Sequence, residues 1–109
     1  MVSRVKVNMR VCGKETMIEV KAIGDDEYEV TAETDCPNVR QLIDMLPILN
    51  IIDLTDKPNS RIWDCFKEAR MSSNCLTPAA VLNAAWIEAG LLSKNLAKKN
   101  GYVSIEYLD

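Results

Sequence analysis

Apolar and polar residues alternate regularly along the first third of the chain. Residues 4–12 place apolar side chains at every second position and polar or charged ones between them: Val5, Val7, Met9 and Val11 alternate with Arg4, Lys6, Asn8 and Arg10. The same period of two recurs over 16–23 and 27–33, with turn-forming residues at 12–15 and 24–26. Such a period is typical of strands that bury one face. The pattern predicts a three-stranded meander of consecutive hairpins.

From Pro37 onward the apolar period becomes that of a helix. Proline suits the first helical position, and the apolar residues that follow at helical spacing are Val39, Leu42, Ile43 and Leu46. Pro47 ends this helix, and the stretch 47–60 has no period that favours either structure. Asn59 or Ser60 is expected to cap a second helix that runs to about residue 71. Its inward stripe would be Ile62, Cys65, Phe66 and Ala69.

A third helix and a last strand are expected in the remaining segment. Thr77-Pro78 combines a hydroxyl N-cap with proline at the first helical position. The helix that follows is almost wholly apolar through residue 92, which indicates either a central core helix or an interface between subunits. It is expected to continue to Asn100-Gly101, residues that tolerate left-handed geometry. Residues 102–107 alternate again and predict a fourth strand.

These elements predict one α+β domain over residues 1–109. In chain order they are β-β-β-α-α-α-β, forming two layers: a four-stranded mixed sheet with the fourth strand beside the first, and the helices on one face. Short connections favour antiparallel neighbours, so the direction of the chain can be counted from element to element. The count places Cys12, Cys36 and Cys75 at the same end of the domain.

Composition and charge exclude several function classes. The 109-residue chain has a net charge of −3 and 48% hydrophobic residues, which are values of a globular protein. An acidic balance without a Lys/Arg-rich block argues against a nucleic-acid partner. The alternating N-terminus has no apolar run for export or membrane insertion, so no membrane contact is expected and a cytoplasmic location is predicted. Histidine is absent from the sequence, which excludes Ser-His and Cys-His catalytic pairs within one chain.

The four cysteines carry the functional hypothesis. In a reducing cytoplasm, clustered thiols favour metal binding or redox chemistry over structural disulfides. Cys65 lies in the apolar stripe of a helix and is interpreted as a core residue. Cys12, Cys36 and Cys75 are the candidate ligands of a metal or cofactor. Three thiolates suit zinc with an open fourth position, which water, a substrate, Asp35 or a partner's residue would take, or an iron–sulfur cluster.

Three functions remain open from the residues alone. The first is a small protein that binds zinc or an iron–sulfur cluster through the three thiols. The second is a non-catalytic interaction module that forms a homodimer through the apolar helix 78–92. The third is a thiol-based redox enzyme, for which no catalytic residue is assigned. The cysteine spacings match no standard zinc or ferredoxin motif, so the metal hypothesis depends on topology.

Four short motifs carry a resemblance to a family. They are Val11-Cys12-Gly13, Glu33-Thr34-Asp35-Cys36, Ser73-Asn74-Cys75-Leu76-Thr77-Pro78 and Glu88-Ala89-Gly90-Leu91. Over nearly its full length the chain resembles an uncharacterised family of small three-cysteine proteins from anaerobic microbes, a domain of unknown function. The resemblance implies that Cys12, Cys36 and Cys75 form the family's set. The chain departs from the family by inserting Asn74 and by carrying Cys65 where the family has a small apolar residue, and the resemblance implies no reaction.

Overall fold

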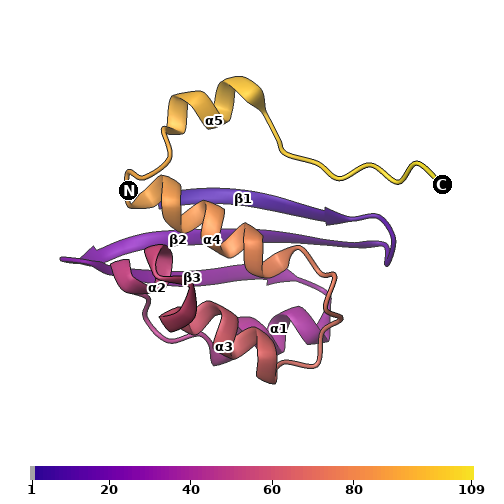
Figure 1. Cartoon of the computed structure of the whole chain (residues 1–109), viewed down its shortest axis with the longest axis horizontal. Helices are drawn as coiled ribbons and strands as arrows, with labels where there is room; N and C mark the ends of the chain where they lie inside the picture. The colour runs from indigo at the N-terminus through magenta and orange to yellow at the C-terminus, as the bar shows by residue number, and fades with distance from the viewer. Residues whose placement is uncertain (1) are drawn as a thin grey trace.

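The first three elements form an antiparallel sheet. The computed structural model describes residues 2–109, and Figure 1 shows the three strands with helices beside and across them. The strands are β1 (Val2–Met9), β2 (Lys14–Gly24) and β3 (Glu27–Thr34), in the order β1-β2-β3. Val5 pairs with Ile18 across the first hairpin, and Ile18 pairs with Ala32 across the second. The predicted meander is confirmed, with strand ends shifted by a few residues.

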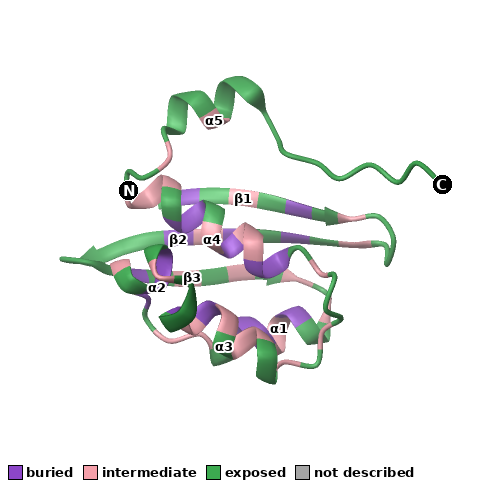
Figure 2. Cartoon of the chain, viewed as in Figure 1, coloured by how far each residue is buried: buried purple, intermediate pink, exposed green. Residues whose placement is uncertain are grey.

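One face of the sheet forms the floor of the core. Ile18 and Val20 are fully buried and Val7 nearly so, whereas the residues that alternate with them, such as Lys6 and Met17, are exposed. A strand directs successive side chains to opposite faces, so this alternation separates core from solvent. Figure 2 shows the buried residues gathered where the helices meet the sheet.

The helical layer has more helices than the three that the spacing of apolar residues predicts. Its helices are α1 (Pro37–Met45), α2 (Ile51–Thr55), the short 3-10 helix η1 (Lys57–Asn59), α3 (Arg61–Glu68), α4 (Thr77–Glu88) and α5 (Lys94–Asn100). Helix α4 contacts β1 and β2, whereas α1 contacts β3. The predicted start of a helix at Pro37 is confirmed, and α4 begins at Thr77, one residue before the predicted first helical position at Pro78.

The stretch 47–60 is held by local hydrogen bonds instead of an amphipathic period. Leu49 exchanges two backbone hydrogen bonds with Tyr28, each 2.9 Å, which attaches the stretch to β3. Asn50 caps α2 in a capping box with Asp53, whose carboxylate also pairs with Arg61 at 2.6 Å. Hydrogen bonds of this kind do not require apolar residues at regular spacing, so the structure of this stretch could not be predicted from a hydrophobic period.

The predicted continuous third helix is wrong, because the chain turns after Glu88. Gly90 has a φ of 77°, in the left-handed region that glycine adopts at little cost. The N–H groups of Leu91 and Leu92 then both donate to the carbonyl of Trp86, at 2.9 and 3.2 Å. A new helix, α5, begins after this turn.

The predicted four-stranded mixed sheet is also wrong. Within residues 2–109 the sheet has three strands, and residues 101–109 run extended without regular structure. Helix α5 carries the chain away from the sheet before this segment begins, and the segment then runs above β1 in Figure 1. Its side chains stay exposed, Val103 by 91%. An alternation of apolar and polar residues shows that a segment could pair with the edge of a sheet. Whether the segment reaches that edge depends on the connection before it, which here is the turn at Gly90 and helix α5.

Glu88 joins the end of α4 to two strands. Its Oε1 accepts a hydrogen bond from the buried Ser3 hydroxyl at 2.8 Å, and its Oε2 accepts one from the Ala22 N–H at 3.0 Å. Within residues 2–109 the pairing of β1 with β2 runs as far as Val2 and Lys21, just before Ala22. The carboxylate therefore accepts from a backbone N–H of β2 at the position that follows these described pairs.

Candidate thiol site at one end of the sheet

Three connections at one end of the long axis carry the candidate thiols. Cys12 lies in the turn from β1 to β2, Cys36 between β3 and α1, and Cys75 between α3 and α4. All three connections lie at the right-hand end of the sheet in Figure 1, in agreement with the count of chain reversals. All four cysteines are free thiols. The roles of the three as ligands stay predictions.

Cys12 is the most accessible of these thiols. The turn that holds it is closed by hydrogen bonds from the Cys12 N–H to Met9 O at 3.2 Å and from the Gly13 N–H to Arg10 O at 3.3 Å. Gly13 has a φ of 72°, which explains the glycine at this position. The Cys12 side chain is exposed, and its Sγ lies 3.5 Å from Met9 O. The turn thus presents this sulfur to solvent.

Cys36 occupies the N-cap position of α1 and has a fixed backbone. Its N–H donates to Thr34 Oγ1 at 3.1 Å, and its carbonyl accepts from the Arg40 N–H at 3.0 Å. The Thr34 hydroxyl also lies 2.9 Å from the Thr16 hydroxyl on the neighbouring strand. The half-buried side chain packs against the core. Cys36 is therefore the anchored member of the set.

Cys75 directs its thiol toward a buried hydroxyl. Its Sγ donates to Thr77 Oγ1 at 3.2 Å, and Thr77 is 1% exposed. Leu76 holds the N-cap position of α4, so the prediction of Thr77 as a hydroxyl N-cap is wrong. The backbone N–H of Cys75 donates to Ser72 O at 3.1 Å in the preceding turn. This loop is mostly exposed.

Cys65 has different surroundings from the other three. It lies in α3, half-buried, with its Sγ 3.5 Å from the carbonyl of Met45 at the end of α1. Burial raises the pKa of its thiol, the nearby Asp64 carboxylate raises it further, and the charge of Arg61 opposes both effects. A thiol held protonated is a poor metal ligand and nucleophile.

The structure brings the three thiols to one end without assembling them into a ligand set. Among residues 2–109, no three Cys, Asp or Glu side chains are grouped so that they could hold a metal ion. Sequence reasoning also missed the threonine hydroxyls beneath this end, those of Thr16, Thr34 and Thr77. Thr16 lies two positions before the buried Ile18 on the same face of β2 and is itself 3% exposed, so the alternation of this strand could have predicted its burial.

Fold and site together define a small α+β protein with free thiols on three connections at one end of its sheet. The chain belongs to a family of unknown function, DUF6951, which matches residues 3–100. Comparisons with curated proteins and with solved structures found no match. Among the helices of residues 2–109, none combines the length and apolar character needed to cross a membrane.

Proposed function

We propose that the end of the fold bearing Cys12, Cys36 and Cys75 takes up a thiophilic metal centre, either a zinc ion or an iron–sulfur cluster. The observation that carries this proposal is the position of three free thiols on three separate connections at one end of the sheet. Thiolate sulfur prefers zinc and iron–sulfur centres over calcium or magnesium. The ligand set is completed by a water, a substrate or a partner's residue.

Uptake of the metal requires two of the thiols to move. Cys36 is held by the hydrogen bonds around Thr34, whereas Cys12 lies on an exposed turn and Cys75 on an exposed loop. Metal-bound sulfur is deprotonated, so the hydrogen bond from Cys75 to Thr77 is broken and protons are released. Binding should therefore slow backbone amide exchange in the Cys12 turn and in the loop before α4.

The direct test is metal analysis and ultraviolet-visible spectroscopy of protein purified and reconstituted without oxygen. We expect stoichiometric zinc or iron in the natural chain, loss of the metal in the triple variant Cys12→Ser/Cys36→Ser/Cys75→Ser, and retention in Cys65→Ser. The last variant is a matched control, because it removes the thiol that lies apart from the set. Equal metal content in the triple variant, or none in the natural chain after reconstitution, contradicts the proposal.

A second candidate function is an interaction module that dimerises through α4. The observation that favours it is an apolar groove beside this helix, to which Ala80 and Ile87 contribute side chains. Sedimentation of the triple cysteine variant separates the two functions, since a dimer that needs neither metal nor thiols favours this one. A monomer at every concentration contradicts it.

A further inference from the structure

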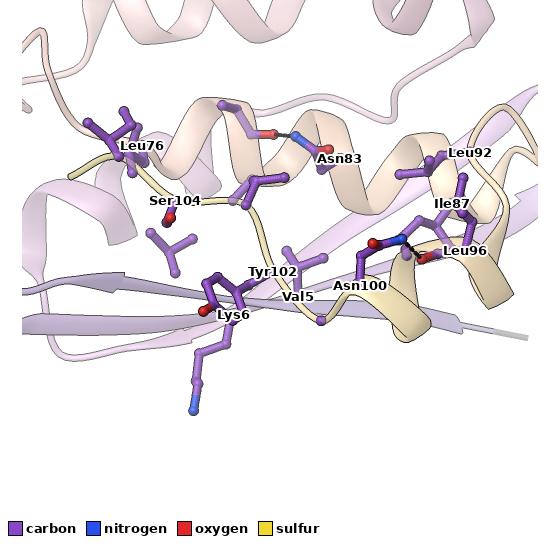
Figure 3. A pocket seen from close by; sticks show the side chains of 17 residues that line it. Val5, Lys6, Leu76, Asn83, Ile87, Leu92, Leu96, Asn100, Tyr102 and Ser104 are labelled. Carbon is purple, nitrogen blue, oxygen red and sulfur yellow. Dashed lines mark hydrogen bonds between the residues drawn. The ribbon is translucent and has the colours of Figure 1, made fainter.

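An apolar groove lies between β1, α4 and α5 (Figure 3). Its volume is about 620 Å³, and its walls include Val5, Ile87, Leu92 and Leu96. The amide groups of Asn83 and Asn100 also face it, and each donates to a carbonyl one helical turn earlier at 2.8 Å. The groove therefore offers a hydrophobic surface with few polar groups, a combination that suits an apolar partner.

The C-terminal segment forms the outer wall of this groove while leaving its own apolar side chains in solvent. Residues 101–105 line the groove. Between residues 102 and 108 five apolar side chains are largely exposed: Tyr102 81%, Val103 91%, Ile105 65%, Tyr107 72% and Leu108 86%. Single exposed apolar residues are common, but five within seven positions form a patch that a stable protein normally covers.

We propose that residues 102–108 of a second copy of this chain fill the groove, in a reciprocal dimer with two-fold symmetry. This proposal rests on the interaction function and gives it a specific occupant. The segment leaves α5 at Gly101, whose N–H donates to Ala97 O at 2.9 Å, and it then follows the rim of its own groove. The C-terminal segment does not fill its own groove, because it forms the outer wall of that groove. In a two-fold dimer, the segment of each copy fills the groove of the other copy.

Charge complementarity supports the same occupant. Lys98 and Lys99 are exposed on the last turn of α5, the helix that borders the groove. The C-terminal segment carries the opposite charge, with Glu106 and Asp109. Pairing one copy's segment with the other copy's groove brings acidic side chains toward basic ones, which favours this partner.

Equilibrium sedimentation and light scattering over a range of concentrations test the proposal. We expect the full chain to reach twice its 12.2 kDa mass. The segment variant Tyr107→Asp/Leu108→Asp, at two exposed positions that do not line the groove, and the groove variant Leu96→Asp should each raise the dimer dissociation constant by about thirtyfold or more. The control Val11→Asp changes a side chain that is likewise exposed, by 66%, but lies on the β1–β2 connection. It should leave the dimer intact.

Mixing the two monomeric variants gives the sharper test. The segment variant keeps an intact groove and the groove variant keeps an intact segment, so an equimolar mixture should form a heterodimer that neither variant forms alone. Circular dichroism verifies that each variant folds, and Asn83→Arg replaces Leu96→Asp as the groove variant if the latter does not.

Three results overturn the proposal. They are a monomeric natural chain at all concentrations, a dimer that persists in the segment variant, and a mixture without heterodimer. The second result would retain the interaction function while rejecting this occupant. Repeating the measurement on the triple cysteine variant after chelation keeps the result separate from the metal proposal.

Discussion

Replacing Asp53 by asparagine should destabilise the fold far more than a surface substitution of the same kind. The Asp53 carboxylate is 3% exposed and accepts hydrogen bonds from the Asn50 N–H, the Arg61 N–H and the Arg61 guanidinium. The guanidinium also donates to Ile48 O at 2.8 Å. One side chain thus holds together both ends of the stretch that carries α2.

The magnitude follows from the donors that asparagine leaves without an acceptor. If its oxygen replaces Oδ1, its amide NH₂ faces the Asn50 N–H at 2.9 Å and Arg61 Nη2 at 2.6 Å, which are both donors. Hydrogen bonds to charged groups contribute about 1.5–3 kcal/mol each. The Arg61 side chain is 41% exposed, so solvent screens part of this energy. We expect the free energy of unfolding to fall by about 2–4 kcal/mol.

Urea denaturation followed by tryptophan fluorescence measures this change. Trp86 is a suitable reporter, because its indole N–H donates to Leu54 O at 2.8 Å, next to Asp53. The midpoint should fall while the slope stays constant, since the surface exposed on unfolding is unchanged. The control Asp44→Asn removes an exposed carboxylate 4.0 Å from Arg40 and should cost no more than about 0.5 kcal/mol.

The pH dependence of the free energy of unfolding gives an independent measure of the Asp53 contribution. Burial alone would raise the pKa of Asp53, but the hydrogen bonds from Arg61 and Asn50 and the charge of Arg61 outweigh it and lower the pKa below its ordinary value of 3.8. A lowered folded-state pKa means that this stabilisation is fully present above the ordinary value and is lost as the pH falls through the folded-state value. The difference between the natural chain and Asp53→Asn should therefore shrink in acid. A constant difference, or a cost equal to that of Asp44→Asn, refutes the reasoning.

Three further substitutions and one labelling experiment test other contacts. Glu88→Gln should lower the free energy of unfolding in urea by about 1–2 kcal/mol, because one amide oxygen replaces two carboxylate acceptors. Ser60→Ala should leave it unchanged or raise it by up to about 1 kcal/mol, since the buried hydroxyl lacks a hydrogen-bond partner among residues 2–109; a clear loss would reveal a missed partner. Gly90→Ala should lower the thermal midpoint, because its φ of 77° costs other residues about 1–2 kcal/mol. Alkylation followed by mass spectrometry should label Cys65 more slowly than Cys12, because Cys65 is half-buried and burial raises its pKa whereas Cys12 is exposed. Equal rates would contradict that assignment.

The meander was predictable because its information is local. Each strand of residues 2–34 alternates, and each pair is joined by a short turn, so every strand is delivered directly to its partner. Residues 102–107 alternate just as regularly and form no strand within the described residues. Their expected partner, β1, lies about a hundred positions earlier in the chain. Whether they reach it depends on the turn at Gly90 and on the direction of α5.

The candidate site was predictable in position but not in detail. Counting reversals placed the connections of Cys12, Cys36 and Cys75 at one end, because strand and helix directions alternate when connections are short. The count contains no side-chain geometry. It therefore could not show that Cys75 bonds to Thr77, or that no metal-holding group is assembled among residues 2–109.

The amino-acid sequence by itself determined the three strands, the start of α1 and, to within one residue, the start of α4, because these features depend on period and on neighbouring residues. The tertiary structure decided the end of α4, the attachment of the stretch 47–60 through Asp53, and the exposure of the C-terminal segment. Those features depend on contacts between residues distant along the chain, and a side-chain period carries no information about which distant surface a segment will meet.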